Sequence, residues 1–323
     1  MIREKWPISA SAPRARVIID NDFSGDPDGL VQLAHHLLSP SVEIRAIVAS
    51  HLRSDDTHWN RFSSSVEVAE QRAMQVVSLC GKQGSVRVLR GAEGPMVQPG
   101  VPVESPGVDF IVSEALRDDT DLPLFVACGG SLTQIASAYL RDPRIAERLT
   151  VIWIGGGEYP GDFVPAGVTS DEYNFAEDRL AAMEVFNRSS LRLWQVPRGA
   201  YRQAIMSRAE ILTRIAPHGA LGGYLADALT ATVVDFERIA HLGGETYVMG
   251  DSPLVLLTAL QTTFEPNAAS SKHREVACPN LEFDGSYQSN SNGRTIRVYE
   301  TLDNRLMFED FFAKLELFAA GRV

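Results

Sequence analysis

Cysteine is scarce in this sequence, and its cysteines lie far apart. The 323 residues include three of them, Cys80, Cys128 and Cys278, with no CxxC pair and no Cys/His cluster. A disulfide framework or a zinc site of the usual Cys/His type is therefore not expected. This usage suits a reducing compartment, so we expect a cytoplasmic protein.

Long apolar runs and an excess of positive charge are also missing. No apolar run reaches membrane-spanning length. Residues 1–16 include several basic side chains but no apolar stretch as long as that of a signal peptide. We expect neither a membrane partner nor a targeting segment. The 30 Lys and Arg residues are outnumbered by 41 Asp and Glu residues, which gives a net charge of −11. A nucleic-acid partner is not expected, because phosphate binding needs a basic surface.

Strand-like and helix-like segments alternate along most of the chain. Apolar runs predict strands at residues 17–20, 42–50, 86–89, 122–128, 149–154, 191–196 and 296–298. Helical periodicity predicts helices at residues 29–38, 63–79, 108–116, 132–140, 181–186, 224–238, 251–260 and 309–319, with Asp251 as an N-cap. The polar residues 272–292 predict a loop or a hairpin. This order predicts one α/β domain over residues 1–323, with a mostly parallel sheet and helices on both faces.

Three of the predicted strands end in unusual loops, at residues 20–29, 129–133 and 155–157. The first is acidic and the other two are rich in glycine. In parallel α/β sheets, ligands bind beyond the carboxyl ends of the strands. The three loops therefore indicate one shared site at that edge of the sheet.

The first loop is dense in negative charge. It contains Asp20, Asp22, Asp26 and Asp28 within nine residues. Like charges so close together are unfavourable unless a positive charge lies among them. Oxygen ligands suit a hard cation, so we predict calcium, with magnesium as the alternative. A solvated acidic loop without a metal is the other interpretation.

Six motifs occur in an order that is similar to that of a known family. They are VIIDNDFSGDPDGLVQLA at 17–34, RGAEGPM at 90–96, GGSLTQIASAYLRDPRI at 129–145, IGGG at 154–157, EYNFAEDRLAA at 172–182 and GDSPL at 250–254. Together they resemble the motifs of nucleoside hydrolases. The resemblance implies calcium-dependent hydrolysis of the N-glycosidic bond of ribonucleosides, and a homodimer or homotetramer.

The resemblance also implies roles for particular residues. The implied metal ligands are Asp22, Asp28, Asp251 and the backbone carbonyl of Thr133. Asp22 would also accept a proton from the attacking water. Glu172 and Asn174 resemble residues that hold the ribose hydroxyls.

Two positions depart from the family pattern. The family's paired aspartates are adjacent, whereas this chain has Asp26-Pro27-Asp28. We prefer an insertion that keeps Asp28 as the metal ligand and moves Asp26 toward the sugar, while gapless counting puts Pro27 at the ligand position. A histidine that precedes the late aspartate in part of the family is Gly250 here. The acid that protonates the departing base, and hence the base specificity, stays open.

Several histidines are further candidates. His51 follows a predicted strand and is a candidate ribose contact, and His241 is a candidate contact to the departing base. His35 and His36 lie on the first predicted helix, where packing or surface roles are expected.

Three other functions remain possible at this point. The Asp-x-Asp after the first strand also occurs in phosphatases of the haloacid dehalogenase type. A relative that binds sugar or nucleoside without turnover is a second alternative. A hydrolase with an altered glycoside specificity is a third.

Overall fold

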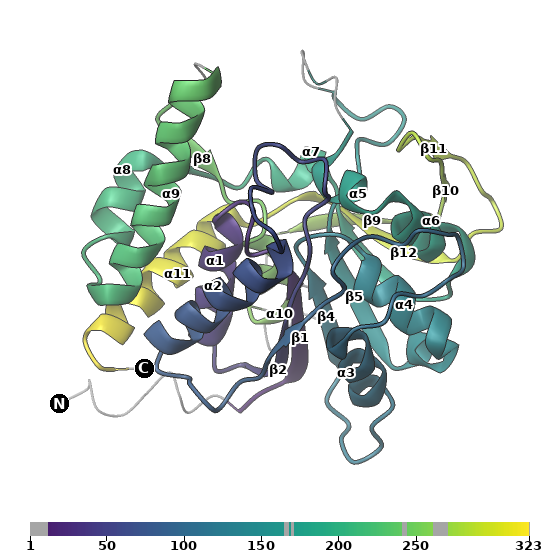
Figure 1. Cartoon of the computed structure of the whole chain (residues 1–323), viewed down its shortest axis with the longest axis horizontal. Coiled ribbons are helices and arrows are strands. Elements are labelled where there is room, and N and C mark those ends of the chain that lie inside the picture. Colours follow the sequence, from purple (N-terminus) through teal and green to yellow (C-terminus); the bar gives the residue numbers. More distant parts are fainter. Residues whose placement is uncertain (1–11, 165–167, 169–170, 241–243, 261–270, 323) are drawn as a thin grey trace.

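The computed structural model of the chain contains an eight-stranded sheet with helices on both faces (Figure 1). It describes residues 12–164, 168, 171–240, 244–260 and 271–322. The strands, in spatial order, are β3 (Val88–Arg90), β2 (Val42–Ala49), β1 (Ala15–Asn21), β4 (Leu124–Cys128), β5 (Leu149–Ile154), β6 (Arg192–Val196), β12 (Thr295–Thr301) and β9 (Lys272–Ala277). Neighbouring strands are parallel except β9 and β12, which pair antiparallel. The predicted fold class is confirmed.

The helices mostly follow the predicted periodicity. They are α1 (Asp28–Leu37), α2 (Ser65–Leu79), α3 (Pro106–Ala115), α4 (Thr133–Arg141), η2 (Pro143–Glu147), α5 (Tyr173–Glu177), α6 (Arg179–Arg188), α7 (Arg198–Tyr201), α8 (Arg208–Glu210), η3 (Ile211–Ile215), α9 (Gly219–Ala240), α10 (Pro253–Thr258) and α11 (Asn304–Ala319). Two short antiparallel pairs join β7 (Ile205–Ser207) to β8 (Thr246–Val248) and β10 (Asn280–Leu281) to β11 (Tyr287–Gln288). No helix among the described residues is long and apolar enough to cross a membrane.

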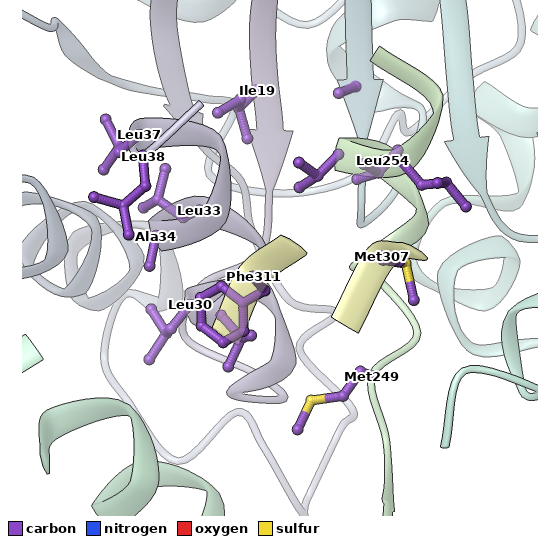
Figure 2. Packing of buried hydrophobic residues seen from close by; sticks show 14 of the residues in the cluster. Ile19, Leu30, Leu33, Ala34, Leu37, Leu38, Met249, Leu254, Met307 and Phe311 are labelled. Carbon is purple, nitrogen blue, oxygen red and sulfur yellow. The ribbon is translucent and has the colours of Figure 1, made fainter. Parts of the chain in front are cut away.

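Each face of the sheet carries its own apolar cluster, because side chains alternate along β1. Val17 and Ile19 point to the cluster under α1, α2, α9, α10 and α11, whereas Ile18 points to the cluster under α3, α4 and α6. Figure 2 shows part of the first cluster, including Leu33 of α1 and Phe311 of α11. Each fully buried side chain of this kind contributes about 1.5–3 kcal/mol. This packing fixes α1, and with it the acidic loop that precedes α1.

One expectation about local structure was wrong and another was incomplete. Helix α10 has Ser252 as its N-cap, and Asp251 lies one residue earlier, with its backbone N–H donating to Asp28 Oδ2 at 3.0 Å. Residues 272–292 form more than a loop or hairpin, because β9 joins the main sheet beside β12. An edge strand is paired on one side only, so its polar sequence is compatible with strand structure. The single domain over residues 1–323 stays a prediction.

Candidate functional site

A cavity of about 240 Å³ lies at the carboxyl ends of β1, β4 and β5. The acids that line it are Asp22, Asp26, Asp28, Glu172 and Asp251. The aromatic residues that line it are Trp59, Tyr173, Tyr201 and Phe236. The cavity thus combines carboxylates from three distant segments with apolar walls, at the edge of the sheet that the sequence indicated.

The end of β1 places Asp22 at the cavity, against the glycine loop after β4. A Cβ atom on Gly130 would lie 3.2 Å from Asp22 Cγ, and one on Gly129 would lie 2.4 Å from Asn21 Nδ2. Larger residues would push the two strand ends apart. The glycine pair therefore allows the β4 loop to approach the Asp22 carboxylate closely.

Asp26 and Asp28 face different partners. Asp28 opens α1, and its Oδ2 accepts the backbone N–H of Asp251 at 3.0 Å. Asp26 Oδ1 accepts from the Tyr247 hydroxyl at 2.6 Å and from the Asp28 backbone at 3.2 Å. Pro27 is the N-cap of α1. This arrangement favours the insertion over gapless counting, because Asp28 is the carboxylate beside Asp251.

Burial and mutual repulsion raise the pKa values of these acids. The pKa of Asp22 is well above its usual range because of burial and then the charges of Glu177 and Asp251. The pKa of Asp28 is also raised well above its usual range, by burial and by Asp251 and Asp26. Burial raises the pKa of Asp251 to about 7. A nearby cation would relieve this repulsion.

The acids fit a hard cation in chemical type, since calcium and magnesium prefer oxygen ligands. Within the described parts of the chain, no lysine or arginine forms an ion pair with Asp22, Asp26, Asp28 or Asp251. No three His, Cys, Asp or Glu side chains of that part are already arranged to hold a metal ion. The carboxylates would therefore have to turn toward a shared ion.

Thr133 is placed differently from the other implied ligands. It does not line the cavity, and its hydroxyl donates to Asp178 at 2.6 Å. Thr133 is the first residue of α4, and a carbonyl at that position accepts from the helix residue four positions later. Gly129 is the residue of this loop that lines the cavity. The Gly129 carbonyl, however, already accepts from Asn174 Nδ2 at 2.8 Å, so the Thr133 carbonyl stays the predicted ligand.

Glu172 and Asn174 both line the cavity, and both are strongly tied to the protein. Glu172 accepts the backbone N–H groups of Gly156, Asn174 and Phe175 and the hydroxyl of Tyr201, at 2.7–3.3 Å. Asn174 Nδ2 donates to the carbonyls of Gly129 and Ile154, at 2.8 and 2.7 Å. Glu172 thus caps α5, a role that the sequence did not indicate. The remaining polar group of the Asn174 side chain is its oxygen.

Of the two histidine candidates, the structure describes His51 alone, and His51 does not line this cavity. His51 is fully buried and is not among the lining residues, and burial lowers its pKa to about 4. His241 lies outside the described residues. His35 and His36 are both fully buried on α1, in agreement with a packing role rather than a surface role.

The sequence did not single out the aromatic walls or Glu177. Trp59 and Phe236 come from the β2–α2 loop and from α9, and His58 stacks on Phe236 with ring centroids 4.6 Å apart. Glu177 is buried, its pKa is raised to about 7 by burial, and its charge raises the pKa of Asp22. Glu177 lies within the EYNFAED motif, so an extra acid there was the available signal.

Solved structures with the same fold are nucleoside hydrolases. A purine-preferring ribonucleoside hydrolase from Gardnerella vaginalis has a TM-score of 0.71 and 19% identity, and the match covers 94% of this chain and 99% of that chain. A plant nucleoside hydrolase has a TM-score of 0.69 and 16% identity, and an inosine-uridine preferring nucleoside hydrolase from Bacillus anthracis has 0.68 and 14%, with the same coverage. At these identities, the likeness shows the fold alone.

Sequence comparison gives the family. No curated protein matches the chain. The family model described as inosine-uridine preferring nucleoside hydrolase matches residues 17–309, which is most of the chain and includes every motif quoted above. The chain belongs to the inosine-uridine preferring nucleoside hydrolase family, as its motifs predicted.

Proposed function

We propose that this enzyme hydrolyses the N-glycosidic bond of ribonucleosides in a calcium-dependent reaction, with Asp22 as both metal ligand and general base. The observation that carries the proposal is the meeting of Asp22, Asp28 and Asp251 at one cavity without a compensating lysine or arginine in the described residues. Family membership supports the reaction class. It gives no support to the phosphatase alternative.

The ion would be held by the carboxylates of Asp22, Asp28 and Asp251 and by one backbone carbonyl of the β4–α4 loop. The resemblance implies the carbonyl of Thr133 for this role, and Gly129 is the residue of the same loop that lines the cavity. Calcium has the oxygen preference that this set satisfies, with magnesium as the alternative. When bound, the ion would orient the sugar's vicinal hydroxyls and make an adjacent water more acidic.

The chain's own residues supply the remaining chemistry. Asp22 would act as general base and take the proton of the attacking water, because its carboxylate lines the cavity at the place assigned to the ion and the water. Departure of the base builds positive charge on the sugar, which the surrounding carboxylates stabilise. Asn174, Glu172 and Asp26 line the space for the ribose.

The aromatic walls are suited to the nucleobase. Trp59 and Phe236 line the cavity, and together with His58 they form a group of rings with centroids 4.5–5.9 Å apart. Such rings provide flat apolar surfaces for a base without selecting one base by hydrogen bonds. A ribonucleoside with its sugar over the carboxylates and its base toward these rings fits this division.

The direct test is product analysis in phosphate-free buffer, with a panel of purine and pyrimidine ribonucleosides. We expect free base and ribose in equal amounts, and no phosphate from simple phosphomonoesters. Calorimetric binding of nucleosides without products would instead support a non-catalytic relative. Sedimentation of the same sample tests the proposed homodimer or homotetramer, and cell fractionation tests the proposed cytoplasmic location.

A further inference from the structure

A line of buried polar side chains runs from the cavity into the core under α1. Asn21 Nδ2 lies 2.9 Å from Asp251 Oδ2 and 3.3 Å from Gln32 Oε1. Gln32 Nε2 contacts His36 Nδ1, and His36 Nε2 lies 2.8 Å from Thr258 Oγ1. Asn21, Gln32 and His36 are completely buried, although much of their surroundings is apolar. This line connects a predicted metal ligand to the interface of α1 and α10.

The direction of each hydrogen bond in this line follows from its two ends. Asn21 Oδ1 accepts the Asp22 backbone N–H at 2.8 Å, so the amide nitrogen of Asn21 faces Asp251 and Gln32. Gln32 then presents its oxygen to Asn21 and its nitrogen to His36. His36 accepts at Nδ1 and donates from Nε2 to Thr258.

Thr258 closes the far end of the line. Its hydroxyl donates to the Leu254 carbonyl at 2.7 Å, so its oxygen is free to accept from His36. Reversing either amide would place two donors or two acceptors face to face. Because unpaired polar groups are costly in a buried site, one arrangement of the line is strongly favoured.

We infer that Gln32 and His36 are positioning residues that orient Asn21, which in turn sets the orientation of the Asp251 carboxylate and its place relative to Asp22. This inference rests on the proposed function, because the orientation matters when Asp251 and Asp22 share an ion. Residues that hydrogen-bond to a metal ligand, and so orient it, affect metal affinity and activity without contacting the metal.

His35 provides a matched control on the same helix. It is as deeply buried as His36, but its Nε2 faces Asp310 Oδ2 of α11 at 2.8 Å. Lys314 contacts the same Asp310 carboxylate. This second buried histidine therefore tests packing and stability in α1 without a connection to the cavity.

The experiment compares Gln32→Met and His36→Leu with His35→Leu in calcium titrations and steady-state kinetics. We expect the first two variants to lose about tenfold or more in calcium affinity and in kcat, as is usual when the residue behind a ligand is removed. His35→Leu should keep both values, although it unfolds at lower temperature. His36→Asn, which retains an acceptor near Nδ1, should recover part of the loss. Thr258→Val is a milder variant, should the others fail to fold, and is expected to show a smaller loss of the same kind.

Calcium affinity and kcat in Gln32→Met equal to those in His35→Leu would overturn the inference. A wild-type protein that binds no calcium would instead contradict the proposed function. In that case, crystal structures of wild type and Gln32→Met decide the inference. An Asp251 carboxylate turned away from Asn21 in the variant supports it, and an unchanged carboxylate contradicts it.

Discussion

Buried acids near the two ends of β1 differ in whether arginine or lysine side chains compensate their charge. Near its start, Glu114 is buried and contacts Arg16 at 2.6 Å, with Arg45 and Arg117 both at 3.1 Å. Near its end, Asp22 shares a cavity with three other aspartates, and no arginine or lysine of the described chain is paired with them. Glu114 therefore has three arginine partners, whereas the four aspartates have no arginine or lysine partner among the described residues.

The difference indicates two kinds of buried charge. Glu114 is compensated by the protein, whereas the four aspartates of the cavity would be compensated by a bound ligand. Arginine side chains of the protein compensate the charge of Glu114, so we assign these ion pairs a structural role. At the strand ends, burial and like charges raise the pKa values of Asp22 and Asp28 instead. The clustered aspartates are unfavourable for folding on their own. We therefore expect a cation and a substrate to bind there.

Removing the carboxylate at the centre of the uncompensated group should have the largest effect. Asp22 is assigned both to the ion and to the water proton, so Asp22→Ala should slow hydrolysis by about a thousandfold or more, roughly 4 kcal/mol of barrier. Circular dichroism should show an unchanged fold. The exposed Asp119 gives a control, Asp119→Ala, which should keep full activity. Near-normal turnover in a folded Asp22→Ala protein would remove the basis of the mechanism.

Substitution of Glu114, the acid with arginine partners, should lower stability rather than activity. Glu114→Gln leaves the buried Arg16 without its partner, so we expect a loss of about 3 kcal/mol in the free energy of unfolding, with activity retained. Asp251→Asn removes one of several like charges, so in calcium-free buffer it should not lower stability. Urea unfolding of both variants measures the contrast. Equal destabilisation by the two substitutions would show that the two groups of acids do not differ in this way.

A further question is whether the cavity at the carboxyl end of β1 also contains an acid that protonates the departing base. Gly250 lines the cavity and cannot donate a proton. A general acid contributes about a hundredfold to ten-thousandfold. We therefore expect a nitrophenyl riboside, whose leaving group needs no protonation, to be cleaved about a hundredfold faster than inosine.

His241→Ala and His58→Ala identify a substitute acid, if one acts. An acid at either position should narrow the gap between the two substrates in wild type, and its removal should widen the gap. Equal rates on both substrates in wild type and in both variants would contradict the expectation that leaving-group protonation is weak here.

Stability of the calcium-free protein should depend on pH. Burial raises the pKa values of Asp20 and Glu177 to about 7, from about 4 when unfolded. Between these values the folded state holds protons that the unfolded state has released. Asp22, Asp28 and Asp251 act in the same direction, and these acids outnumber the buried histidines His35, His36 and His51, whose lowered pKa values act in the opposite direction. The free energy of unfolding should therefore fall by at least about 1 kcal/mol as pH rises from 5 to 7. Urea midpoints in EDTA at several pH values measure this, and a rise over the same interval would contradict it.

Much of the fold was predictable because its signals are local. The apolar run before Asp20 and the helical periodicity after Asp28 depend on neighbouring residues, and both elements were found near their observed bounds. The acidic loop was predictable as part of a site for a related reason, since repulsion among close carboxylates can be read directly from the sequence.

The rest of the site depends on tertiary contacts. Trp59 and Phe236 are about 180 residues apart in sequence yet line one cavity, and nothing in their local sequence marks them. The hydrogen bond from the Thr133 hydroxyl to Asp178 was not predictable either, whereas the role of the Thr133 carbonyl stays a prediction. The line through Gln32 and His36 was not visible either, because a helical pattern does not show which polar residue faces a distant aspartate.

The most direct measurement follows ribose release from a ribonucleoside before and after removal of divalent ions. If the strand-end aspartates require a cation, EDTA should lower the rate at least a hundredfold. Added calcium should restore the rate, and magnesium should restore it less well. A chelated protein that still releases ribose at the original rate would contradict the claim that the uncompensated carboxylates are a metal site.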